Sequence, residues 1–176
     1  MRLISKCIIV IFFALIAVCP SLAAGEMSFF EFLSNQNINK TAPDFTLQTT
    51  QGKEVNMTQF RGGKKAIVFF WATWCPHCRV ALKDLNMNLA QIEAKGIKVI
   101  PVDLGETLEE VRAYIKNNKI GIDIFLDKES SLAEPYNLVG VPTLYFVNEA
   151  GKIISVEHSL PKNLDSTFSK SKLKSP

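Results

Sequence analysis

An uninterrupted apolar run that leads straight into two closely spaced cysteines constrains the fold more than any other feature of this chain. Residues 66–71 read AIVFFW and follow two glycines and two lysines, so they predict a strand that is buried on both faces. Cys75 and Cys78 come next, and beyond them apolar residues recur at helical spacing as far as Gly96. The order strand, tight turn and long helix puts Cys75 at the N-terminus of a helix.

Shorter patterns predict the other elements. Alternating segments on either side of Gln51 and Gly52 predict a β-hairpin over residues 45–57. A second buried strand is predicted over 97–102, and Thr107 with Glu110 forms a capping box for the helix after it. The later patterns indicate a short strand at 123–126, a helix from Ser130 or Ser131 to Leu138 whose first turn Pro135 distorts, strands at 143–147 and 153–156, and a short helix around 164–168. This alternation predicts an α/β fold with a central mixed sheet flanked by helices.

The length of 176 residues, 47% of them hydrophobic, fits one globular domain with short appendages. Residues 1–24 have a basic start, an apolar run from Cys7 to Cys19 and small residues at the end, which is the pattern of a secretory signal peptide. The alternative is an uncleaved membrane anchor, although the apolar run is shorter than the roughly 20 residues that a spanning helix needs. We therefore predict export to the periplasm or cell envelope, with cleavage after Ala23 or Ala24.

The remaining boundaries follow from composition. Residues 25–41 form a leader and linker, residues 42–165 the folded domain, and residues 166–176 a polar tail that carries several lysines. Loss of Arg2 and Lys6 with the export segment leaves 18 basic and 17 acidic residues. This balance gives no indication of nucleic-acid binding.

The positions of the four cysteines point to redox chemistry. Cys7 and Cys19 lie in the export segment, so only Cys75 and Cys78 remain in the mature chain, and a framework of structural disulfides is excluded. In an oxidising compartment, a single pair of cysteines three residues apart is suited to cycling between dithiol and disulfide. We predict no metal and no cofactor other than this disulfide, because a zinc site needs two further ligands and only His77 and His158 are available.

The motif divides the chemistry between its residues. Cys75, at the helix N-terminus, meets unpaired N–H groups and the positive end of the helix dipole, which stabilise a thiolate. Cys78 lies about one helical turn later and faces the interior, so it is the resolving thiol. Pro76 occupies the first turn, where a missing N–H costs nothing. His77 next to the thiolate favours the ionised, reduced form, or is simply an exposed residue at the helix start.

At WATWCPHC the sequence resembles the thioredoxin superfamily, and residues 42–160 resemble its TlpA/ResA-type branch. Four segments carry the resemblance: APDFTL with the hairpin after it, WATWCPHC, the stretch between Leu104 and Leu126, and GVPTLYFVNEAGKI. It implies a thioredoxin-like fold with an N-terminal β-hairpin and a TlpA-type α/β insertion.

The resemblance also assigns roles to residues outside the cysteine pair. It implies a cis Val141–Pro142 bond, with Pro142 against the cysteines and the Val141 backbone offered to an extended substrate segment. It places Trp71 in the core and Trp74 beside the active site. Glu106 and Asp84 are candidates for an acid that manages the proton of Cys78, although each is equally well explained as an ordinary exposed carboxylate.

The function implied is that of an extracytoplasmic thiol:disulfide oxidoreductase acting on protein substrates. We favour a reductant, for example in cytochrome c maturation, that is recharged by a membrane electron-transfer partner. Two departures leave the direction of electron flow open: Ala81 and Lys83 stand where relatives usually have glutamate and often proline, and the Pro76–His77 dipeptide is that of the oxidising DsbA type.

Three alternatives have specific grounds. The first is a DsbA-like oxidase that introduces disulfides. The second is a Sco-like copper chaperone with His158 as a distant ligand, whose family spaces its cysteines one residue wider. The third is a peroxiredoxin, suggested by the APDFTL start, although Ala72 holds the position where those enzymes have threonine.

Overall fold

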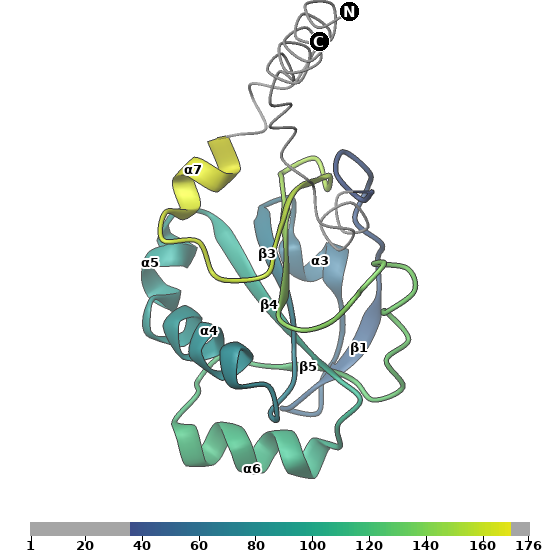
Figure 1. The fold of residues 1–176 in the computed structure, drawn as a ribbon, viewed down its shortest axis with the longest axis vertical. Helices are drawn as coiled ribbons and strands as arrows, with labels where there is room; N and C mark the ends of the chain where they lie inside the picture. The colour runs from purple at the N-terminus through teal and green to yellow at the C-terminus, as the bar shows by residue number, and fades with distance from the viewer. Residues whose placement is uncertain (1–35, 170–176) are drawn as a thin grey trace, which may run out of the picture.

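The computed structural model of the protein describes residues 36–169 (Figure 1). The predicted export segment at 1–24, most of the leader at 25–41 and the last residues of the tail, 170–176, lie outside the described residues. Within the described range, none of the helices combines the length and the apolar character needed to cross a membrane.

A seven-stranded sheet with the order β2-β1-β5-β4-β3-β6-β7 forms the centre of the protein. Its strands are β1 Thr46–Thr49, β2 Glu54–Asn56, β3 Lys65–Trp71, β4 Ile97–Leu104, β5 Phe125–Asp127, β6 Thr143–Val147 and β7 Ile153–Glu157. The β3–β4 and β4–β5 pairs are parallel, whereas the other four pairs are antiparallel. The predicted mixed sheet and the hairpin at its start are confirmed.

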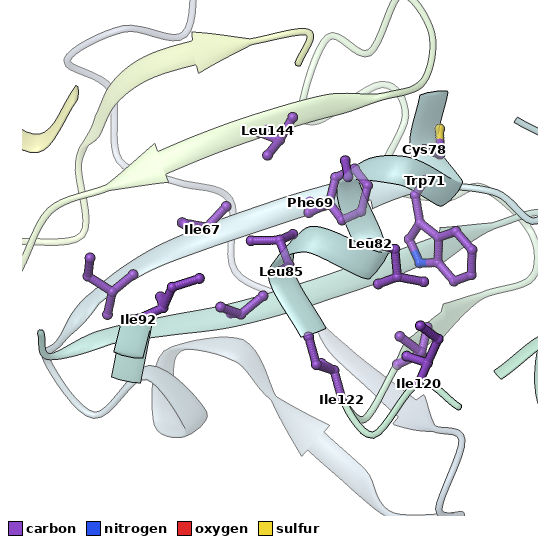
Figure 2. Packing of buried hydrophobic residues seen from close by; sticks show 14 of the residues in the cluster. Ile67, Phe69, Trp71, Cys78, Leu82, Leu85, Ile92, Ile120, Ile122 and Leu144 are labelled. Carbon is purple, nitrogen blue, oxygen red and sulfur yellow. The ribbon is translucent and has the colours of Figure 1, made fainter. Parts of the chain in front are cut away.

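The sheet separates two cores. One face carries α4 Pro76–Met87, α5 Leu89–Ala94, α6 Leu108–Asn118 and α7 Leu164–Ser169, and the other carries α3 Met57–Arg61 and the turns at 131–137. Alternate residues of β3 therefore enter different cores, so that Trp71 faces α4 and Phe70 faces Tyr136. Figure 2 shows Leu82 and Leu85 of α4 in the same cluster as Trp71. Every residue from 66 to 72 is fully buried, as the apolar run predicts.

The long helix predicted after the cysteines is wrong in one respect, because it is interrupted at Asn88. α4 ends at Met87, α5 begins at Leu89, and Asn88 between them has φ −100° and ψ 8°. The Asn88 Nδ2 group donates to the carbonyl of Asp84 at 2.8 Å. An asparagine side chain that binds the backbone in this way competes with the continuing helix, while the apolar spacing on either side is unaffected.

The helix predicted from Ser130 or Ser131 to Leu138 is also wrong, because this segment forms a series of turns. Pro135 has no N–H with which to continue a helical ladder. Asp127 instead accepts the N–H groups of Ser131 and Leu132 at 2.8 and 2.9 Å. The turns bring the fully buried Tyr136 into the second core.

The short helix α3 is not predicted from the sequence. Asn56 caps it by accepting the N–H of Gln59 at 3.0 Å. Its last residue, Arg61, is buried, and the Arg61 Nη1 group donates to three carbonyls, those of Lys64, Asn148 and Glu149, at 2.8, 2.9 and 3.1 Å. α3 is thereby attached to the turn between β6 and β7.

Both ends of the described chain pack against the domain. Asn37 is buried, and its Nδ2 group donates to the carbonyl of Tyr136 at 2.7 Å. At the other end, α7 carries Phe168 against Phe146, with ring centroids 5.4 Å apart. Asn37 and Phe168 thus both pack against the sheet domain.

Candidate active site

The carboxyl end of β3 delivers the two cysteines to the start of α4. Cys75 is the N-cap residue, Pro76 is the first helical residue, and Cys75 and Cys78 form a disulfide with their Cα atoms 5.2 Å apart. The disulfide lies at the rim of the first core, next to the strand end. The strand and helix predicted from sequence therefore place the pair at bonding distance without any other element.

The geometry of the helix start supports a thiolate at Cys75. The Cys75 Sγ atom accepts the backbone N–H of Cys78 at 3.2 Å, and the Cys75 backbone has an extended conformation typical of an N-cap residue. In the reduced protein the same N–H and the helix dipole act on the sulfur of Cys75. Cysteine thiols at helix N-termini and in Cys-X-X-Cys motifs have a pKa of about 3.5 to 7.5, compared with about 8.5 for a free cysteine.

Burial distinguishes the two sulfur-bearing residues. Cys78 is fully buried, whereas Cys75 keeps 4% of its surface exposed. An external thiol or disulfide therefore reaches Cys75 first. Next to it, Trp74 is 67% exposed, while Trp71 is fully buried, which confirms Trp71 as a core residue.

The loop before β6 closes the site on the opposite side. The Val141–Pro142 peptide bond is cis, as the resemblance implies. The Val141 carbonyl oxygen lies 3.7 Å from the Cys75 Sγ atom, so this backbone segment borders the disulfide. Val139, in the same loop, is 40% exposed.

Two histidines far apart in the sequence line the same groove next to the cysteine motif. The groove has a volume of about 240 Å³ and is lined by residues of α4, the cis-proline loop and the segment after β7: His77, Val80, Ala81, Asp84, Pro142, His158, Ser159 and Leu160. The His158 Nδ1 atom lies 3.2 Å from the Pro142 carbonyl oxygen. The sheet order, in which β6 connects β3 to β7, is what brings His158 to the motif.

The two carboxylates predicted as proton carriers occupy different environments. Asp84 is half-buried and lines this groove on the outer side of α4. Glu106 is half-buried after β4, and its two carboxylate oxygens accept the backbone N–H and the hydroxyl of Thr73, both at 2.5 Å. Glu106 therefore holds the turn two residues before Cys75.

Asp103 is a site-adjacent residue that the sequence prediction missed. It lies in β4 in register with Trp71 and is fully buried, and burial together with the nearby Glu106 raises the pKa of its carboxyl to about 9. The available signal was a single acidic residue in the apolar stretch IPVDL, which continues the predicted strand by two residues.

We found no grouping of three or more histidine, cysteine or acidic side chains arranged to hold a metal ion within residues 36–169. The chemistry of the described site is that of its disulfide. A seven-stranded mixed sheet with a Cys-Pro-His-Cys disulfide at the start of a helix defines a thioredoxin-fold thiol:disulfide oxidoreductase.

Comparisons with known proteins agree with this class. The chain belongs to the AhpC/TSA family, whose model matches residues 38–156. The thiol-disulfide oxidoreductase ResA of Bacillus cereus is 27% identical over 126 residues, which are 72% of each chain. The TlpA/ResA-type resemblance is therefore confirmed.

Solved structures show the same fold. The thioredoxin domain of a thiol-disulfide oxidoreductase from Bacteroides vulgatus is 25% identical with a TM-score of 0.64, over 77% of this chain and 96% of that one. A thiol:disulfide interchange protein from Bacteroides sp. is 25% identical with a TM-score of 0.63, over 77% and 88% of the two chains.

Proposed function

We propose that this protein is exported and reduces disulfides of protein substrates outside the cytoplasm. The observation that carries the proposal is the asymmetric disulfide, in which Cys75 caps the helix and keeps some exposure while Cys78 is fully buried. The export pattern of residues 1–24 supports the location, and N-terminal sequencing of the mature protein tests it.

The reaction follows from the positions of the two sulfurs. In the reduced protein, the Cys75 thiolate attacks a substrate disulfide, a mixed disulfide forms, and one substrate thiolate leaves. Cys78 then loses its proton and attacks Cys75, which releases the second substrate thiolate and forms the Cys75–Cys78 disulfide. Two electrons pass from the protein to the substrate. A membrane electron carrier that supplies two electrons as thiols returns the pair to the dithiol.

We propose that the polypeptide substrate binds to the exposed apolar surface around Cys75. Trp74 and Val80 are 67% and 61% exposed and flank the cysteine pair in the sequence, and the exposed Val139 belongs to the loop that carries the cis-proline. The Val141 backbone beside the sulfur is available to an extended polypeptide segment. Such a surface suits segments that carry an accessible disulfide next to apolar residues.

The test is a reductase assay with a disulfide-containing protein substrate. Cys75→Ser should abolish turnover, and Cys78→Ala should accumulate a mixed disulfide with the substrate through Cys75. The reverse Cys75→Ala variant is the matched control and should trap little, because Cys78 is buried. Equal trapping by both variants would contradict the assigned roles.

A DsbA-like oxidase is the second candidate, because the exposed Pro76–His77 dipeptide between the cysteines matches that type. A glutathione redox titration separates the two. Thioredoxin and DsbA have potentials of about −270 and −120 mV, which differ by roughly 7 kcal/mol in the stability of the dithiol. A potential below about −220 mV supports the reductant, and one near −120 mV supports the oxidase.

A further inference from the structure

A cluster of buried polar groups from Trp71, Asp103 and Tyr114 lies beneath the active-site turn. Asp103 pairs in register with Trp71 of β3 on one side and with Leu126 of β5 on the other. In-register residues of parallel strands point to the same face of a sheet, so the carboxyl lies between two large apolar side chains on the face covered by α4 and α6. Asp103 is fully buried in this row.

The surroundings of Asp103 favour a neutral carboxyl. No described residue donates a hydrogen bond to either of its oxygens, and the buried Trp71 Nε1 and Tyr114 hydroxyl groups also have no hydrogen-bond partner among the described residues. The charged and titratable groups that face this cluster are Glu106, Glu110 and Tyr114, with Arg79 of α4 acting on Tyr114. Burial, then the Glu106 side chain, raises the pKa of Asp103, whereas the Glu106 N–H acts in the opposite direction.

Glu106 connects this carboxyl to the cysteines. Its carboxylate already accepts two hydrogen bonds from Thr73, whose backbone leads through Trp74 to Cys75. A carboxylate that accepts from Thr73 can also accept the proton of a neutral Asp103. An ionised Asp103 would have no proton to donate, and it would place a second negative charge beside Glu106.

We propose that Asp103 is a positioning residue for thiol–disulfide exchange: its carboxyl shares one proton with Glu106, and this carboxyl pair holds the Thr73 turn that presents Cys75. The inference rests on the proposed function, because it concerns the reactivity of the same cysteine pair. Asp103 touches neither sulfur and acts through Glu106 and Thr73.

The shared proton also couples the redox equilibrium to pH. Reduction adds two electrons to the disulfide, and Cys75 then carries negative charge as a thiolate. This charge makes it harder for Asp103 to release its proton in the reduced protein than in the oxidised protein. Over the alkaline range where Asp103 titrates, the reduced protein therefore holds more protons than the oxidised protein. The redox potential then falls more steeply with pH than it would if Asp103 did not titrate. One additional proton per two electrons corresponds to a tenfold change in the equilibrium constant per pH unit, or about 30 mV.

Two variants separate the donor from the charge. Asp103→Asn keeps an N–H donor for Glu106 but cannot titrate, whereas Asp103→Leu has a similar branched shape, a larger volume and no donor. At pH 7, the rate at which reduced protein attacks a small aromatic disulfide should be within about threefold of wild type for Asp103→Asn. For Asp103→Leu it should be about tenfold lower, in line with the loss of one hydrogen bond to a charged group.

The decisive measurement is the glutathione redox equilibrium between pH 6 and pH 10. The wild type should show the additional slope above about pH 8, and Asp103→Asn should lack it. Equal slopes for these two proteins, or a wild-type rate for a folded Asp103→Leu variant, would overturn the proposal. Both assays use small reagents, so they give the same answer whichever protein substrate or direction of electron flow is correct.

Discussion

Replacing Asp103 by asparagine should remove a large loss of stability that the protein undergoes between pH 5 and pH 8. Burial and Glu106 raise the pKa of this carboxyl to about 9 in the folded protein. In the unfolded chain the group titrates near ~3.9. Between these two values the folded protein holds a proton that the unfolded chain has released, so the free energy of unfolding falls as the pH rises. The stabilisation is complete below the unfolded pKa and is lost by the time the pH passes the folded pKa.

The magnitude follows from proton linkage. A difference of one bound proton changes the free energy of unfolding by about 1.4 kcal/mol for each pH unit. Over the three units from pH 5 to pH 8, all below the folded pKa of about 9, the wild type should lose roughly 4 kcal/mol relative to Asp103→Asn. Asparagine has nearly the same shape and does not titrate, so the variant lacks this contribution at every pH.

Urea unfolding of the disulfide form at several pH values, followed by far-UV circular dichroism, measures this difference. The other titrating groups are common to both proteins and cancel when the two free energies are subtracted. Glu109→Gln, at an exposed carboxylate of α6, is the control for loss of one negative charge and should run parallel to wild type. If Asp103→Asn also ran parallel to wild type, Asp103 would be ionised in the folded protein and the reasoning would be refuted.

Three further predictions concern stability. Arg61→Met leaves three carbonyls without their buried donor and should lower the free energy of unfolding by about 2–3 kcal/mol, with Arg61→Lys recovering only part; full recovery by lysine would contradict a requirement for the guanidinium. Thr107→Ala removes the capping box of α6 and should cost about 1 kcal/mol in a urea titration, whereas Thr107→Ser should cost little. Phe168→Ala should cost about 3 kcal/mol and raise hydrogen exchange in α7; unchanged exchange there would show that the Phe146 contact does not anchor the helix.

The parts of the site that the sequence predicts are those built from local contacts. The buried strand, the tight turn and the helix start follow one another within residues 66–78, so the position of Cys75 as N-cap is readable from spacing alone. The capping box of Thr107 and Glu110 is equally local and is present as predicted. In each case the residues that determine the geometry lie within one or two turns of each other.

The parts that the sequence does not predict depend on partners far along the chain. His158 reaches the groove beside His77 because β7 pairs with β6, and β6 pairs with β3. Asp103 is buried because the register of β3 and β4 places it against Trp71. A single acidic residue at the end of an apolar run is otherwise expected to face solvent, and no local pattern distinguishes the two outcomes. The break at Asn88 escapes prediction for another reason, since the apolar spacing continues across it.

The electrostatic groups around Cys75 act in opposite directions on the redox potential. The helix N-terminus and the Cys78 N–H stabilise the thiolate and hence the reduced form. The Glu106 carboxylate, bound to Thr73 two residues away, disfavours a second negative charge and so makes the reduced protein a stronger electron donor. A positive charge on His77 would stabilise the Cys75 thiolate and so oppose the effect of Glu106. His77 is exposed, however, and solvent and salt weaken the influence of exposed charges. Because the carboxylate is partly buried and the imidazole is not, the charge of Glu106 should outweigh that of His77, which supports the reductant role proposed above.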